Sequence, residues 1–279
     1  MPETRDIAEP AEQRSAAPSW LPDAAPSRFA LVRRCLTLPL RLWRPWRFWR
    51  EVSAATPVSV GAVLVFLFLI VLTRIGMGVM GTGDEIAFAI SPPPSPGWGL
   101  DAPELIRKVA YPEFASRARN DGVLDPSWLA GPLAGHTMFL LMLLGLGQDR
   151  SRVGVTGAHV FRAWTYGLVW LGAIFLFCAL GGLLDAIVSA RWIYSDFTQA
   201  SDTLESVTAG FVRATESPIL LGVIGVWILL WWHGAIVSSW KVPRGRVGWA
   251  LISVVAIGVG YAAVKLTDHL QTLDIIAAG

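Results

Sequence analysis

The chain has 279 residues, of which 53% are hydrophobic and only 16% carry a charge. A soluble globular domain carries about 25% charged residues, so this chain cannot cover itself with a charged shell. Its long apolar runs exclude disorder for most of the chain, its two cysteines exclude a disulfide scaffold, and its net charge of +2 is too small to indicate nucleic-acid binding. An integral membrane protein remains.

The N-terminal region is polar. Residues 1–27 are rich in Ala, Pro, Glu and Ser, and no apolar run follows the first Met, so we do not expect a secretory signal peptide here. This composition predicts a disordered cytoplasmic tail.

A basic and aromatic segment follows the tail. Residues 28–51 mix seven arginines with Leu, Phe and three Trp, and Pro39 and Pro45 exclude one long helix. We predict that residues 28–56 lie on the cytoplasmic face of the membrane against anionic headgroups; the alternative is a surface that docks a protein partner. The side chains expected at the lipid surface are Arg41, Trp43, Arg44, Trp46, Arg47, Trp49 and Arg50.

Five apolar stretches are long enough to cross the bilayer as helices, which requires about 20 residues. Each must be helical because bare backbone amides in lipid are costly. The predicted spans are 57–80, 127–147, 164–190, 217–239 and 247–266.

The charges between the spans alternate. Lys and Arg exceed Asp and Glu in residues 1–56, 148–163 and 240–246, whereas acids exceed bases in residues 81–126 and 191–216. Because cytoplasmic loops carry the excess of Lys and Arg, this pattern predicts a cytoplasmic N-terminus and an external C-terminus.

The predicted fold is therefore an all-α polytopic membrane protein with five transmembrane helices in residues 57–266. Residues 81–126 and 191–216 are the expected external loops, and residues 267–279 are the expected short external tail.

Three charged residues fall inside the predicted spans near their outer ends. They are Arg74, Asp185 and Lys265. Ionisable groups in a span are the default functional candidates, but long basic side chains can also extend to the headgroups. We expect Asp185 to pair with Arg74, or failing that with Lys265.

Two histidines are the remaining polar candidates. His136 lies near the middle of the second span, beside Thr137, and His233 lies near the cytoplasmic end of the fourth. A histidine at mid-depth can relay protons or bind a metal. A packed, hydrogen-bonded histidine is the simpler interpretation, and we expect no metal or other cofactor.

Small residues recur within the spans. They include Gly131 and Gly135 in the second span and Ala256 and Gly260 in the fifth. Such residues let helices approach closely in lipid, so they predict helix packing or a homodimer rather than chemistry. No phosphate loop, GxSxG turn or HExxH motif occurs, and we expect no enzymatic activity.

Three segments together resemble bacterial members of the Yip1 family. They are RPWRFWRE at 44–51, VFRAWTYGL at 160–168 and KVPRGRVGWAL at 241–251, and the resemblance covers roughly residues 44–266. It implies a five-helix membrane domain. In eukaryotic relatives it implies membrane trafficking and contact with small prenylated GTPases, but the DLYGP-type motif of those relatives is absent, with TYG at 165–167 in its place.

The sequence thus predicts a non-enzymatic protein of the bacterial inner membrane, a scaffold or assembly factor that binds another membrane protein or itself. One alternative is a small-solute or ion transporter with a polar path near His136. Another is an accessory subunit of a redox or photosynthetic complex, in which His136 or His233 touches a pigment, haem or quinone.

Overall fold

A computed structural model describes residues 17–81, 127–176, 180 and 218–278. These residues form helices and short connections and contain no strand, as the sequence predicts. The expected external loops lie outside the described residues, apart from Gly81, which ends a helix.

The N-terminal part is a chain of short helices broken at prolines. A 3-10 turn, η1 (Pro22–Ala24), precedes α1 (Arg28–Thr37), α2 (Pro39–Leu42) and α3 (Pro45–Glu51). Pro39 and Pro45 each occupy the first turn of a helix, where a missing N–H costs nothing, so the predicted breaks are confirmed.

The expectation of a disordered tail over residues 1–27 is wrong for residues 17–27. Leu21 is fully buried, and the guanidinium of Arg34 donates to its carbonyl over 3.1 Å. Trp20 packs its ring against Phe48 and donates to Glu51. Burial of these two apolar side chains offsets the cost of ordering a segment that is otherwise polar.

Longer apolar helices make up the rest. They are α4 (Val60–Gly81), α8 (Ser127–Gly145), α10 (Gly157–Gly167), α13 (Pro218–His233) and α14 (Gly245–Ala278). The short α9 (Gly147–Ser151) lies between α8 and α10, and a further helical stretch covers residues 169–176. A π-helical turn, η2 (Gly234–Ser239), extends α13. The backbone of residues 267–278, which the sequence predicts to be an external tail, continues α14 without interruption.

Two of these helices are long and apolar enough to cross a bilayer. They are Ile219–Ser239 and Gly245–Thr267, which correspond to the fourth and fifth predicted spans. Val60–Gly76 and Leu129–Gly145 are shorter apolar helices at the first and second predicted spans, and most of the third lies outside the described residues. Length and composition alone thus allow two membrane spans within the described residues.

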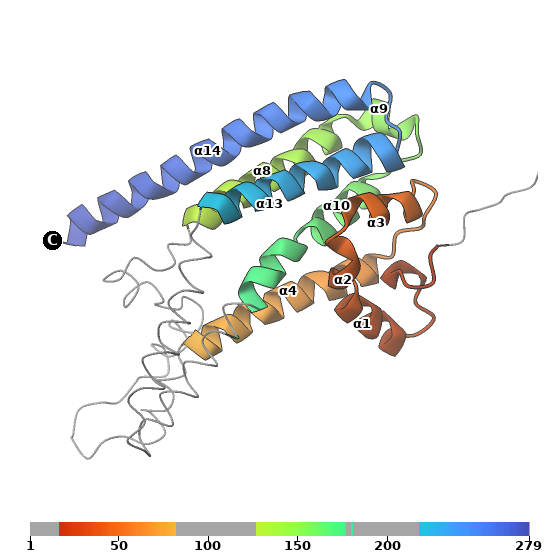
Figure 1. Ribbon diagram of the computed structural model, residues 1–279, viewed down its shortest axis with the longest axis horizontal. Helices are drawn as coiled ribbons and strands as arrows, with labels where there is room; N and C mark the ends of the chain where they lie inside the picture. Colours follow the sequence, from red (N-terminus) through yellow and green to blue (C-terminus); the bar gives the residue numbers. More distant parts are fainter. Residues whose placement is uncertain (1–16, 82–126, 177–179, 181–217, 279) are drawn as a thin grey trace, which may run out of the picture.

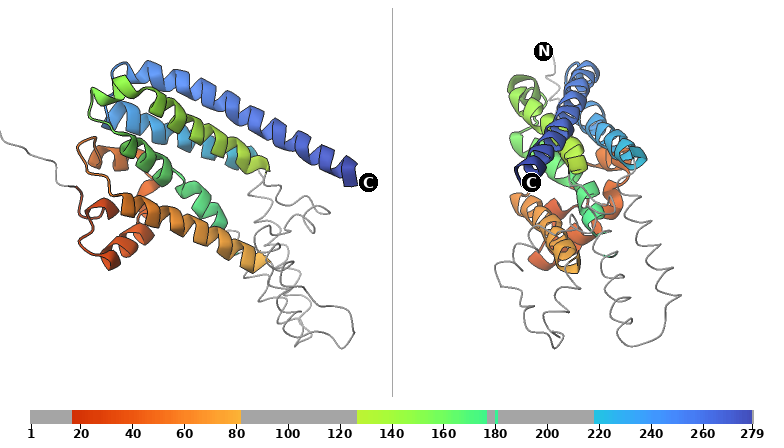
Figure 2. Two further views of the ribbon diagram at one scale, coloured as in Figure 1. Left: turned by 180° about the vertical axis from the view of Figure 1, so that it is seen from behind. Right: turned by 90° about the vertical axis from the view of Figure 1, so that its left-hand side faces the viewer.

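The long helices run roughly alongside one another (Figure 1). The helices α1, α2 and α3 gather at the end of this bundle that is opposite the C-terminus, as the view from behind also shows (Figure 2, left). The same end holds α9 and the turn between η2 and α14.

Among the described helices, α8 and α14 make the most extensive contact, and small residues lie where they meet. A Cβ atom added to Gly260 would lie 2.8 Å from the carbonyl oxygen of Gly131, and one added to Gly135 would lie 3.1 Å from that of Ala256. These backbones therefore approach as closely as glycine allows, as the sequence predicts.

An aromatic cluster joins α3 to the bundle. Phe48 and Trp49 are buried, and both rings pack against Trp231 of α13 at centroid distances of 5.1 and 4.9 Å. A Cβ atom on Gly234 would lie 2.5 Å from the Trp49 ring, so glycine makes room for this side chain. The basic segment is therefore part of the protein core on one side.

Candidate functional site

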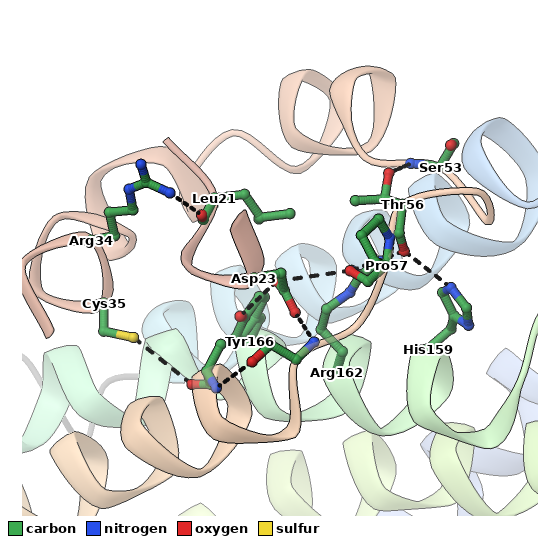
Figure 3. Close-up of polar contacts among 12 residues, drawn as sticks. Leu21, Asp23, Arg34, Cys35, Ser53, Thr56, Pro57, His159, Arg162 and Tyr166 are labelled. Carbon is green, nitrogen blue, oxygen red and sulfur yellow. Dashed lines mark hydrogen bonds and ion pairs between the residues drawn. The ribbon is translucent and has the colours of Figure 1, made fainter. Parts of the chain in front are cut away.

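A buried carboxylate lies where the N-terminal segment meets α4 and α10 (Figure 3). Asp23 Oδ1 accepts a hydrogen bond from the backbone N–H of Ser59 over 2.6 Å, and Oδ2 accepts one from the Tyr166 hydroxyl over 3.1 Å. Oδ2 also lies 3.9 Å from Nη1 of Arg162. Ser59 directly precedes α4, so the negative charge also faces the positive end of that helix.

The partner guanidinium is equally buried. The side chains of Arg162 and Asp23 are 1% and 0% exposed. Arg162 Nη1 donates to the carbonyl of Pro57 over 3.0 Å, whereas Nε and Nη2 have no protein partner among the described residues. Burial lowers the pKa of Arg162 and the nearby Asp23 carboxylate raises it. Because arginine remains charged in proteins, Asp23 is the counter-charge that makes this burial tolerable.

His159 lies one helical turn before Arg162. Its Nε2 faces the carbonyl oxygen of Thr56 at 3.2 Å and must donate, because a carbonyl only accepts. Its Nδ1 then accepts from the backbone N–H of Thr156 over 3.2 Å, which caps α10. Burial, and next the positive charge of Arg162, lower the pKa of His159. The bonding and the surroundings both favour the neutral ring.

A second polar connection joins α8, α10 and α13. His136 is fully buried; its Nε2 donates to the carbonyl of Trp164 over 2.9 Å, and its Nδ1 accepts from the indole N–H of Trp232 over 3.0 Å. The indole of Trp231 donates to the carbonyl of Ala163 over 2.8 Å. We refer to His136, Trp231 and Trp232 as the His–Trp belt. It binds the backbone of α10 at two neighbouring carbonyls.

These groups connect segments that lie far apart in the chain. Burial raises the pKa of the Cys35 thiol to about 12, with a smaller contribution from Asp23, so the thiol stays protonated and weakly nucleophilic. Within the described ranges, no group of three or more His, Cys, Asp or Glu side chains could hold a metal ion.

The structure places four of the five polar residues that the sequence singled out. His136 is the packed, hydrogen-bonded histidine, and the ring of His233 packs edge-on against Trp249 at 5.0 Å. The Arg74 guanidinium lies 5.8 Å from the centre of the Phe175 ring. Lys265 Nζ lies 6.0 Å from the ring of Tyr261 on its own helix. Asp185, the expected partner of Arg74, lies outside the described residues.

The expected lipid-surface set divides between surface and core. Trp43 and Trp46 are exposed, as are the arginines of the set, Arg41, Arg44, Arg47 and Arg50. The expectation that Trp49 lies at the lipid surface is wrong, because its side chain is 2% exposed and packs inside the aromatic cluster. The Trp49 side chain extends from α3 toward Gly234, where the absence of a side chain leaves space for the indole ring.

Sequence reasoning missed the buried network of Asp23, Arg162, Tyr166 and His159. Arg162 and Tyr166 do lie within VFRAWTYGL, one of the segments that resemble the Yip1 family, and Thr156 stands three residues before His159, as in a helix cap. Asp23 is one acid among six in the N-terminal 56 residues. Only the neighbouring Trp20 and Leu21 signalled that it lies against a core.

Comparison of the chain with protein-family models, with curated proteins and with solved structures gave no match.

Proposed function

We propose that this chain is a multi-pass protein of the bacterial inner membrane with five spans, a cytoplasmic N-terminus and an external C-terminus. The grouping of basic residues supports this topology. The arginines of α1 to α3, Arg150 of α9, and Lys241 and Arg244 before α14 belong to elements at one end of the bundle (Figure 1). Such a grouping is what the positive-inside rule requires of a cytoplasmic end.

We infer that its role is that of a scaffold or assembly factor, without enzymatic activity. The main support for this proposal is a pair of exposed small residues on the outward face of α14. Gly258 and Ala262 lie there, four residues apart and exposed, and a Cβ atom on Gly258 would meet nothing within 4 Å. Small residues one turn apart let a second transmembrane helix approach closely. That helix would come from another membrane protein or from a second copy.

Substitution of the outward glycine tests the proposal. Gly258→Ile should leave the fold intact, because the position is open, and should release a partner that co-purifies with the natural chain in mild detergent. Gly222→Ile on α13 is the matched control, since its Cβ atom also meets nothing within 4 Å. A natural chain that purifies as a monomer without partners from native membranes would contradict the scaffold role.

The transporter and redox-subunit alternatives receive less support. Transport through His136 would require a ring that water can reach, whereas both of its nitrogens bind protein groups and the residue is buried. An absorption spectrum of the purified protein would reveal a pigment or haem near His136 or His233. The Yip1 resemblance fits the five-span proposal, and without a DLYGP-type motif we propose a membrane-embedded partner rather than a GTPase.

A further inference from the structure

A stripe of exposed apolar side chains runs along α1 and α2. Phe29 and Leu40 are 80% and 78% exposed, which is far more than a folded protein in water needs to leave uncovered. Phe29, Val32 and Leu36 recur at steps of three and four residues, so they share one face of α1, and Leu40 is exposed on α2, which follows directly. The α1–α2 stripe consists of Phe29, Val32, Leu36 and Leu40.

The opposite face of the same helices fixes the orientation of the stripe. Cys35, Leu38 and Leu42 are buried against the bundle. The Cys35 thiol lies 3.8 Å from the carbonyl of Ala62, in the first turn of α4. The stripe therefore faces away from the bundle, beside the end of α4 at which the first proposed span begins.

Charge decides what can cover the stripe. Residues 28–51 hold seven arginines and a single acid, Glu51. Glu51 lies 3.5 Å from Arg47 and accepts a hydrogen bond from Trp20, so it is already engaged. Arg28 and Arg33 are exposed on α1 itself. A second copy would bring the same dense positive charge against this one, which disfavours a dimer through this face.

We propose that the α1–α2 stripe lies in the headgroup region of the cytoplasmic leaflet, with Arg28 and Arg33 binding the phosphates of anionic phospholipids. The inference rests on the proposed membrane topology. Apolar side chains of an interfacial helix enter the acyl boundary while flanking arginines remain at phosphate level. The lipid contact is thus placed on α1 and α2, which begin the segment 28–56 that the sequence predicts to lie on the membrane.

Spin labels on the full chain in nanodiscs that contain phosphatidylglycerol test the depth of the stripe. In a background in which Ala replaces Cys35 and Cys178, one label replaces Leu36, and a control label replaces Thr37, which is exposed on another side of α1. The label at Leu36 should collide often with oxygen and rarely with a soluble nickel chelate. The label at Thr37 should collide more with nickel.

The outcomes separate this inference from the topology on which it rests. A third label at Val254, exposed on α14, should be in lipid if that helix spans the membrane. If Val254 is in lipid but Leu36 is as open to nickel as Thr37, the stripe is in water and the inference fails alone. An immobile Leu36 label shielded from both reagents would mean a protein partner and would also overturn it. A label at Leu40 repeats the measurement.

The arginines provide a second test. In nanodiscs of phosphatidylglycerol and phosphatidylcholine, Arg28→Gln and Arg33→Gln should each weaken the preference for spin-labelled phosphatidylglycerol by about fivefold. Arg152→Gln is the matched control, since Arg152 is exposed but lies outside the α1–α2 face. An unchanged preference in the double variant would overturn the assignment of these arginines to lipid phosphate.

Discussion

The hydroxyl of Tyr166 donates a hydrogen bond to the carboxylate of Asp23 across 143 residues of chain. The same carboxylate accepts from the backbone of Ser59 at the start of α4 and faces the guanidinium of Arg162. One acid thus holds together the N-terminal segment, the first long helix and α10. The N-terminal segment is for this reason part of the folded domain.

Asp23→Asn should destabilise the protein strongly. The amide keeps the shape of the carboxylate but leaves the charge of Arg162 buried without a counter-charge, which costs about 3 to 5 kcal/mol. Thermal unfolding in detergent should show this loss. Arg152→Gln, which removes an exposed ion pair at 3.7 Å, should change stability by less than about 1 kcal/mol.

Arg162→Met, combined with Asp23→Asn, should recover much of the lost stability. The double variant removes both charges, and replacement of a buried pair by neutral groups is often close to neutral. If the two losses simply add, the residues are not coupled, and the role given to Asp23 is wrong.

The helix content and the breaks at Pro39 and Pro45 could be predicted from the sequence, because apolar run length and proline geometry act locally. Close helix approach at small residues such as Gly131 and Gly260 was also predictable, but the pairing of α8 with α14 was not. The position of Trp49 was not. An exposed tryptophan and a buried one look alike in a basic segment, and only the space above Gly234, far along the chain, distinguishes them.

The network around Asp23 and Arg162 could not be predicted from the sequence, because it too depends on contacts between segments far apart in the chain. Asp23 and Arg162 have no local pattern in common, and their pairing depends on how α4 and α10 pack. His136 could be predicted as a candidate because a histidine is rare inside an apolar run. Its two partners, the carbonyl of Trp164 and the indole of Trp232, are set by tertiary structure.

Gly167→Ala should disrupt the His–Trp belt. A Cβ atom there would lie 2.5 Å from Cε1 of His136 and 2.8 Å from the indole nitrogen of Trp231, so both rings would have to move. Overpacking of this kind costs about 1 to 3 kcal/mol. Gly172→Ala is the control, because its Cβ atom would make an ordinary contact of 3.5 Å with Ile70. Equal melting temperatures for the two variants would show that the belt adapts freely.

Stability should fall as the medium becomes acidic, and His159 should be one cause. Because burial lowers its pKa in the folded state, the unfolded chain takes up the proton first as the pH falls. The contribution is fully present above the unfolded pKa of about 6.5 and is lost as the pH drops through that value toward the lower folded pKa. Protonation would also put a hydrogen on Nδ1, which now accepts the capping bond from Thr156.

His159→Gln isolates this contribution. Glutamine at the third position of a helix can still bond the capping residue but does not titrate near neutral pH. Unfolding at about pH 7.5 and about pH 5.5 should differ less in the variant than in the natural chain. An unchanged difference would assign the pH dependence to other groups.

Reporters fused to the two ends of the chain should lie in different compartments. The five spans that we propose would place the ends on opposite sides, and the positive-inside rule applied to the arginines of α1 to α3 predicts that the first end is cytoplasmic. A fluorescent protein that folds in the cytoplasm should therefore emit from the N-terminus, and a periplasmic phosphatase should be active at the C-terminus. Since α14 alone leads from the basic turn at Lys241 and Arg244 to Ala278, a cytoplasmic C-terminus would require that helix to remain inside. That result would remove the fifth span and, with it, the outward face on which the scaffold role depends.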